Sequence, residues 1–590
     1  MTTSEAGDAE PHLIPRSILR RASFLLILSL GATLLLTWPL ALHARDRLPN
    51  TDAQADTDTL VAGWLLAYQA HALATAPGEI TAGNIFYPSP HAIFYGPLGA
   101  GASPLFAPIF IATGDTTLAL NATYLLGVGL TVWTMALVVL LWTESLAAAC
   151  VAAFTLLASQ WLTRGLVATA PFAAALFYLP PIIYLAALRT RSVRESLWLV
   201  PLLAVQCLDD LVYIAPAVLA PLSVLVLVRV ARARTRRSGI ALATAILLAL
   251  LLMSPVLAGY VAVRLANPDL AQQTFWKTFT YPLTAWKLVS PASAHAVSIP
   301  IAAFIVALAI VFVRRVRRQP LRSADTIWLH GTLWLVVGTL ISLPHAVFVG
   351  STVVPLPAGI VARWIPSLTL ARTPDRLGLA ALMGAALLAG AATAEAVRFL
   401  RARRATAPGW LEAALAAGLG IAAYLGSAHA DPSRGFLPRD FPMFMPPGWS
   451  DGALAVLRAA PGSVVEIPFP ALDKTTPRIH AEAMYRSTRY WRPLVNGHHS
   501  YYPADFAVRA AWAHLLPDPR AIEVLRDTAD LSLIAVPLDH LLPGARSTWE
   551  SLASFPPREL RVAYRSPNEV IFALRARSGA PQAPAQTPAS

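Results

Sequence analysis

The chain has 590 residues, of which 56% are hydrophobic and only 13% are charged. One soluble core cannot bury that much apolar surface, so most of it must face lipid or other helices. The formal net charge of +13 at pH 7 does not indicate a nucleic-acid partner, because the arginines come in short groups between long apolar runs. That pattern is typical of the cytoplasmic loops of a polytopic α-helical membrane protein.

Residues 22–42 form the first apolar segment, and Arg16, Arg20 and Arg21 precede it. The segment is about as long as a bilayer requires. It lacks a small-residue cleavage site before Asp46, which favours an uncleaved span over a signal peptide. Residues 1–21 are therefore expected to form a cytoplasmic N-terminal segment.

Further apolar runs of about spanning length follow. They lie near 116–142, 145–162, 167–188, 195–208, 211–230, 239–262, 298–313, 325–343, 376–397 and 409–428. With the first span, they predict about eleven transmembrane helices within residues 22–428. Because some of the runs are short enough to be re-entrant or tilted, the count ranges from ten to twelve.

Groups of arginines separate these runs. They fall at 189–194, 229–237, 314–322 and 398–404. With the N-terminus in the cytoplasm, counting off the spans places every group on the cytoplasmic side, as the positive-inside rule requires. An odd number of spans then places everything after about residue 429 outside.

Three segments outside are long. The first outer loop, 43–115, contains an amphipathic stretch at 59–73 that is expected to lie on the membrane surface as an interfacial helix. Residues 263–297 mix aromatic and cationic side chains suited to the headgroup layer. Residues 344–375 are rich in proline, which predicts ordered turns rather than helix.

Residues 429–577 have the composition of a soluble domain. Strand-like runs at 463–469 and 531–536 flank a helical pattern at 521–528, so a small extracytoplasmic α/β domain is expected, with its folded part at about 450–575. The proline-rich tail, 578–590, is expected to be disordered.

Acidic residues open the first outer loop, where Asp52, Asp56 and Asp58 precede the amphipathic stretch. A carboxylate at the membrane surface can ligate a divalent cation such as Mg²⁺ or Mn²⁺ through hard oxygen atoms. It can also act as a base on an incoming hydroxyl group. The alternative is that these side chains are merely solvated.

A second acidic pair, Asp209 and Asp210, interrupts an apolar stretch. Ionisable groups at membrane depth are costly and usually face a cavity or a partner. The span count places this pair at an outer turn. There it either marks a helix end or, if the loop dips inward, faces the same aqueous cleft as Asp58.

Arg372 and Arg376 precede the tenth span on the outer side, against the general charge bias. Guanidinium groups at that level suit a lipid phosphate or pyrophosphate. An ion pair with Asp375 or another carboxylate is the alternative. His498 and His499 are adjacent, but the sequence shows no third ligand at a suitable spacing, so the pair does not predict a metal site.

Several segments together resemble bacterial membrane glycosyltransferases of the GT-C superfamily. In the first outer loop these are Thr37-Trp38-Pro39-Leu40, Asp58 six residues before Trp64, Ala70-His71-Ala72-Leu73 and Asn84-Ile85-Phe86-Tyr87-Pro88. Later segments are Pro355-Leu356-Pro357, Arg363, Pro366, Arg372-Thr373-Pro374-Asp375-Arg376, Glu466-Ile467-Pro468-Phe469-Pro470 and Trp491-Arg492-Pro493-Leu494-Val495-Asn496-Gly497. The resemblance covers most of the chain, although no single motif is highly specific.

The resemblance implies a GT-C-like fold and transfer of a sugar from a polyprenyl-phosphate-linked donor to an acceptor outside the bacterial cytoplasmic membrane. In such enzymes an acidic residue of the first outer loop is central, as base or metal ligand, and Asp58 matches that position. Asp56, Asp209, Asp210, Arg372 and Arg376 are the expected substrate-binding residues. A lipid-anchored donor needs no nucleotide site, so the expected partners are this donor, membrane lipid and a glycan, lipid or protein acceptor.

The chain departs from the family pattern at one place. Relatives commonly carry Glu or Asp and a His shortly after the Phe-Tyr-Pro element, whereas this chain reads Tyr95-Gly96-Pro97-Leu98. A non-catalytic member that binds a lipid-linked glycan, or that scaffolds an envelope assembly through residues 450–575, is therefore the alternative function.

Overall fold

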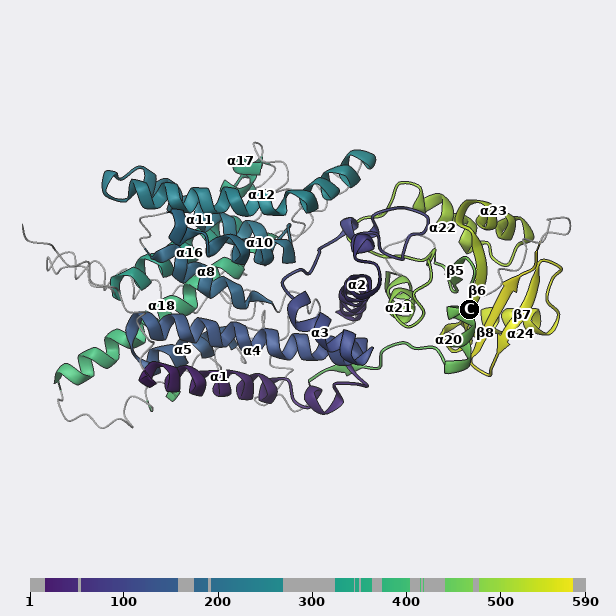
Figure 1. Cartoon of the computed structure of the whole chain (residues 1–590), viewed down its shortest axis with the longest axis horizontal. Coiled ribbons are helices and arrows are strands. Elements are labelled where there is room, and N and C mark those ends of the chain that lie inside the picture. The colour runs from purple at the N-terminus through teal and green to yellow at the C-terminus, as the bar shows by residue number, and fades with distance from the viewer. Residues whose placement is uncertain are drawn as a thin grey trace, which may run out of the picture.

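The computed structural model describes most of the chain. The described residues are 16–50, 55–157, 175–188, 193–268, 324–343, 345–349, 352–362, 374–403, 414, 417–418, 441–470 and 477–576. They form a helical bundle and a C-terminal α/β domain that packs on one end of it (Figure 1). We call the end of the bundle that contacts residues 441–576 the domain end.

The bundle is built from apolar helices. They are α1 (Arg16–Leu36), α3 (Ser103–Thr113), α4 (Thr116–Thr143), α5 (Leu146–Leu157), α8 (Leu179–Ala187), α9 (Val193–Ser196), α10 (Leu199–Asp209), α11 (Ile214–Val230), α12 (Arg236–Ala266), α16 (Ala324–Ser342) and α18 (Leu379–Arg403). Four described segments are long and apolar enough to cross a membrane: 16–36, 116–143, 233–266 and 376–399.

The predicted class, a polytopic α-helical membrane protein with a C-terminal α/β domain, is confirmed. The number of spans stays a prediction. The expected span 298–313 and nearly all of 409–428 lie outside the described residues, as does the tail 578–590.

The described arginine groups lie at the end of the bundle opposite the domain end. Arg21 donates to the carbonyl oxygen of Glu144 at 3.1 Å, so the start of α1 lies beside the end of α4. α11 and α12 turn back at residues 229–237, and α18 runs away from the domain end to finish in its own arginine group. This arrangement is the one that the positive-inside count predicts.

The amphipathic stretch of the first outer loop forms α2 (Ala55–Thr75), but its predicted place on the membrane surface is wrong. Figure 1 shows α2 end-on between the bundle and the C-terminal domain. Trp64, Leu65 and Ala67 are all fully buried, and Tyr485 of the domain packs against Gly63. A helix with apolar residues around most of its circumference has no polar face to turn toward water at a membrane surface.

The prediction of turns without helix at 344–375 is wrong in part. Its described residues form a hairpin, β2 (Ala346–Val349) with β3 (Thr352–Pro355), followed by the short helix α17 (Pro357–Ala362). Proline is compatible with the first turn of a helix, because the N–H group that it lacks has no partner there.

The C-terminal domain contains a four-stranded sheet in the order β5-β6-β8-β7. Its strands are β5 (Ser463–Glu466), β6 (Leu531–Pro537), β7 (Leu560–Arg565) and β8 (Glu569–Leu574). β5 and β6 are parallel, and the other neighbours are antiparallel. The domain helices are α20 (Asp451–Arg458), α21 (Pro477–Ser487), α22 (Phe506–His514), α23 (Pro519–Ala529) and α24 (Pro543–Ser554). A second link to the bundle is the antiparallel pair of β1 (Leu48–Pro49) with β4 (Met443–Phe444).

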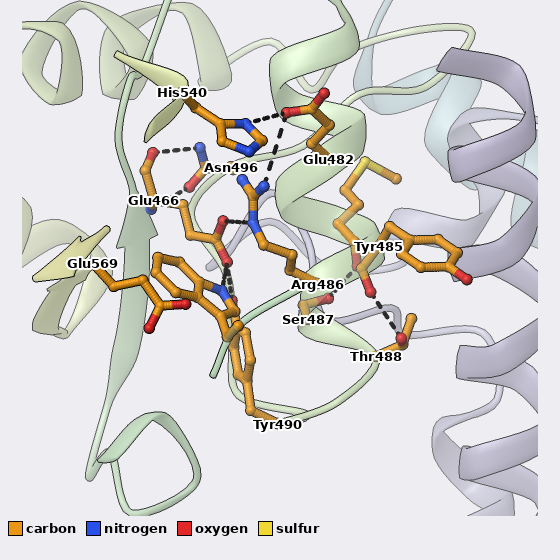
Figure 2. A network of polar contacts seen from close by, with 12 residues as sticks. Glu466, Glu482, Tyr485, Arg486, Ser487, Thr488, Tyr490, Asn496, His540 and Glu569 are labelled. Atoms are coloured by element: carbon orange, nitrogen blue, oxygen red, sulfur yellow. Dashed lines mark hydrogen bonds and ion pairs between the residues drawn. The ribbon is translucent and has the colours of Figure 1, made fainter. Parts of the chain in front are cut away.

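A buried ion pair joins the sheet to α21 (Figure 2). Nε of Arg486 lies 2.7 Å from Oε2 of Glu466, and both side chains are at most 2% exposed. Trp449 and Tyr490 donate to Oε1 of Glu466 at 3.0 and 2.9 Å. The side chain of Asn496 accepts the backbone N–H of Glu466 and donates to its carbonyl oxygen, both at 2.8 Å. This network fixes α21, which packs on α2, to the edge strand β5.

Replacing Glu466 with Gln should destabilise the C-terminal domain by about 3 kcal/mol, because it leaves the buried guanidinium of Arg486 with only its longer ion pair to Glu482 at 3.8 Å. Thermal unfolding of the full-length protein in detergent, followed by tryptophan fluorescence, measures the change. Glu550→Gln is the matched control. Its ion pair with Arg546 is exposed, so the loss there should stay below about 1 kcal/mol.

Candidate functional site

Residues 84–101 of the first outer loop, here called the loop segment, connect the C-terminal domain to the bundle. The N–H groups of Phe86 and Tyr87 donate to the carbonyl oxygens of Asn496 and Leu494 at 3.1 and 3.0 Å, and the N–H of Leu494 donates back to Asn84 at 2.7 Å. These backbone hydrogen bonds attach the segment to the domain much as a strand attaches to a sheet.

His499 of the domain packs directly on the loop segment at Gly96. A Cβ atom at Gly96 would lie 1.7 Å from the imidazole ring, so only glycine leaves room for it. The ring is 4% exposed and lies edge-on to Trp64, with the ring centroids 6.1 Å apart. A histidine of the domain therefore fills the space above Gly96 and fixes the domain against the loop segment.

Gly96→Ala should displace His499 and loosen the domain from the loop segment. Limited proteolysis of the full-length protein should show cleavage between bundle and domain at least 10-fold faster than in the wild type, a size that follows from a loss above about 1.4 kcal/mol. Gly448→Ala is the control, because no heavy atom lies within 4 Å of an added Cβ there. Equal cleavage rates for the two variants would contradict the tight contact.

Two buried histidines make the domain sensitive to acid. Burial lowers the pKa of His480 to about 3 and the pKa of His499 to about 3, and the charge of His498 acts in the same direction on both. His480 lies between the rings of Phe469 and Phe506. Neither of its ring nitrogens has a hydrogen-bond partner within the described ranges.

Because these folded-state pKa values lie below the usual 6.5, the unfolded chain binds protons that the folded chain excludes. Their contribution to stability is complete above pH 6.5 and is lost as the pH falls toward 3, at about 1.4 kcal/mol per pH unit for each histidine. His480→Phe should therefore reduce the loss of stability between pH 7 and pH 5 by about 2 kcal/mol. Thermal unfolding of the full-length protein at both pH values tests this, and a pH dependence of His480→Phe equal to that of the wild type would contradict the prediction.

At its other end the loop segment holds Asp209, the last residue of α10. The N–H of Gly101 donates to Oδ1 of Asp209 at 3.0 Å, and the N–H of Gly99 donates to its backbone oxygen at 2.9 Å. The side chain is 0% exposed, and Oδ2 has no hydrogen-bond partner among the described residues. One oxygen of this carboxyl group is thus buried without a hydrogen-bond partner in the described part of the chain.

Asp210 has the helix-end role that the sequence leaves open. Its Oδ1 accepts the N–H groups of Val212 and Tyr213 at 2.7 and 3.0 Å, immediately before α11 begins. The guanidinium of Arg376, in the turn before α18, lies 5.3 Å from the centroid of the Tyr213 ring, and its charge acts on the Asp210 carboxyl. Asp209 and Asp210 thus adjoin at one turn, and the charge of Arg376 acts on this turn through Asp210.

The remaining predicted site residues are not brought into this cluster by any described contact. Asp58 lies in the second turn of α2 and is exposed. Asp56 lies on the same helix, but its side chain is outside the described part of the structure, as is all of Arg372. A shared cleft for Asp58 and Asp209 stays a prediction.

Two further residues, Gln69 and Tyr178, connect the loop segment to α2 and to the bundle, and the sequence did not single them out. Gln69 of α2 donates to the carbonyl oxygen of Leu98 at 2.7 Å and accepts from Ser103 at 3.3 Å. Tyr178 donates to the carbonyl oxygen of Gly101 at 3.4 Å. A polar residue in an otherwise apolar helix is the only signal for Gln69. Tyr178 has none, since aromatic residues are common in spans.

Fold and site together define a polytopic α-helical membrane protein whose buried carboxyl group lies where the bundle meets an α/β domain. No family model matches the chain, and no curated protein matches it.

Among solved structures, the crystal structure of ArnT from Cupriavidus metallidurans in the apo state is similar over 95% of this chain and 97% of that chain, with 14% identity and a TM-score of 0.42. The apo oligosaccharyltransferase of Archaeoglobus fulgidus is similar over 88% of this chain and 70% of that chain, with 12% identity and a TM-score of 0.44. Both are distant likenesses in overall shape, and no residue role passes from either protein to this chain.

Proposed function

We propose that this protein transfers a sugar from a polyprenyl-phosphate-linked donor to an acceptor at the outer face of the bacterial cytoplasmic membrane. The observation that carries the proposal is the turn at residues 209–210. There the carboxyl group of Asp209 is fully buried with one oxygen lacking a hydrogen-bond partner among the described residues. The charge of Arg376 acts on the adjacent carboxyl of Asp210, at the domain end of an apolar bundle. The GT-C-like motifs of the sequence supply the reaction class.

The orientation follows from charge. The arginine groups lie at the end of the bundle remote from the domain, and the positive-inside rule assigns that end to the cytoplasm. The loop segment, the turn at 209–210 and the C-terminal domain then lie outside, where a lipid-linked donor presents its sugar.

In the proposed reaction Asp58 accepts the proton of the acceptor hydroxyl as its oxygen bonds to the anomeric carbon of the sugar. The bond from that carbon to the phosphate oxygen breaks, and the polyprenyl phosphate leaves with the electron pair. Arg376 and Arg372 stabilise the charge that develops on the leaving phosphate. Asp56, Asp209 and Asp210 would bind sugar hydroxyl groups.

A divalent metal, Mg²⁺ or Mn²⁺, held by Asp58 is a further part of the proposal. Within the described residues no group of three or more His, Cys, Asp or Glu side chains is placed to hold a metal ion, so the described side chains alone do not form its site. Loss of activity in EDTA that Mg²⁺ or Mn²⁺ restores would support the metal.

Asp58→Asn should reduce incorporation of sugar into an envelope glycan by at least 100-fold, because general-base catalysis contributes about that much. The protein should still insert and unfold at the wild-type temperature. Asp451→Asn, an exposed change on α20, is the control and should keep full activity. Wild-type activity in the Asp58 variant would refute the assignment of the base.

The second candidate is a non-catalytic protein that binds a lipid-linked glycan or scaffolds an envelope assembly through residues 450–575. The observation in its favour is the contact of His499 with Gly96, which fills the position after the Phe-Tyr-Pro element. Under this function, removing the domain abolishes the cellular phenotype, whereas Asp58→Asn does not.

A further inference from the structure

Arg264, near the domain end of α12, has a buried guanidinium nitrogen without a partner. Its Nη1 is buried and forms no hydrogen bond, and no carboxylate in the part of the chain that the structure describes forms an ion pair with it. A buried cationic donor that lacks a partner costs free energy. A ligand that supplies an anionic acceptor would remove that cost.

The side of α12 that carries Arg264 covers the loop segment. Tyr260, four residues earlier, donates to the carbonyl oxygen of Gly96 at 2.7 Å. Asn267, three residues later, donates to the hydroxyl of Tyr95 at 3.3 Å and accepts the N–H of Ala504 at 2.9 Å. Positions i−4 and i+3 share a helix face with position i. Arg264 therefore lies on the helix face between Tyr260 and Asn267, and both of these residues contact the loop segment.

The length of α12 places Arg264 at the level of lipid headgroups. The helix has 31 residues, so it is about 46 Å long, whereas the hydrocarbon layer is about 30 Å thick. With Arg236 and Arg237 in one headgroup layer, about 20 residues cross the hydrocarbon. Arg264 then stands roughly 9 Å beyond its far edge, where lipid phosphates lie.

The carboxyl of Asp210 acts electrostatically on both Tyr260 of α12 and Arg376 of the turn before α18. Arg264 is one helical turn beyond Tyr260, toward the domain. Arg264 therefore lies at the same end of the bundle as the acidic turn and Arg376.

We infer that Arg264 binds a phosphate group carried by a lipid, and that under the proposed function this is the phosphate of the polyprenyl-linked donor. Guanidinium suits this role because its fork of N–H donors matches the oxygens of a phosphate. Ordinary phospholipids share the phosphate chemistry, so the choice between the two lipids is part of the test.

The test uses the full-length protein in phosphatidylcholine nanodiscs, with binding of undecaprenyl phosphate and of phosphatidylglycerol measured separately by native mass spectrometry. Arg264→Gln should weaken binding of undecaprenyl phosphate by about 10-fold to 100-fold, as expected for loss of a charged hydrogen bond. Arg264→Lys, which keeps the charge, should lose less. Arg236→Gln, at the opposite end of the same helix, is the matched control and should bind as the wild type does.

Wild-type affinity for undecaprenyl phosphate in Arg264→Gln would overturn the inference and leave the proposed function standing. An equal loss for phosphatidylglycerol would overturn the assignment to the donor. If the wild-type protein itself does not bind undecaprenyl phosphate, the proposed function fails together with the inference. Unfolding temperatures of the variants exclude a general loss of structure, and the Lys variant decides the matter if the Gln variant does not fold.

Discussion

The backbone of the loop segment, 84–101, is hydrogen-bonded on one side to the C-terminal domain and on the other to the helical bundle, and the candidate site depends on this double attachment. The domain holds the segment through Asn496 and Leu494, and the bundle holds it through Asp209 and Tyr260. Each backbone N–H or C=O group in these hydrogen bonds is paired with protein instead of water. The loop segment therefore cannot move without breaking these bonds unless the domain or the bundle moves with it.

Energetically, the domain side of this attachment rests on the pair of Glu466 and Arg486. That pair positions α21, and Tyr485 of α21 reaches into the bundle, where its hydroxyl lies 2.8 Å from the Thr117 hydroxyl of α4. Buried ion pairs add little net stability, but they fix one arrangement, because any other leaves a charge without a partner. The domain is therefore held in one orientation on the bundle by a network that lies well away from the site itself.

Within the described residues the long apolar runs of the sequence form helices, because such runs have few alternatives to a membrane helix. The number of spans stays a prediction. The sequence also locates β6 closely, and it extends β5 too far only because Pro468 has no N–H for the ladder. The burial of α2 could not be predicted, because apolar residues on every face do not say whether lipid or protein covers them. The strands β7 and β8 were not predicted. Arg561 and Arg565 interrupt the apolar pattern of the edge strand β7, and β8 is a short run with little alternation.

The candidate site, like the fold, could be predicted from the sequence only in part. Charge within an apolar stretch marks Asp209 and Asp210 in the sequence, and charge on the outer side marks Arg376, whose charge acts on Asp210 in the structure. Nothing local indicates that Gly99 and Gly101 hold Asp209, because that contact joins positions 108 residues apart. Only the three-dimensional structure places the glycine-rich end of the loop on the acidic turn.

The length of α12 has one more consequence. The helix is attached at its far end to the loop segment and the domain through Asn267, and its middle must stay within the hydrocarbon. A thicker or thinner bilayer therefore changes the hydrophobic mismatch of α12, and the helix responds by tilting. Since its tip cannot tilt without pulling on Tyr95, lipid composition acts mechanically on the geometry around the acidic turn.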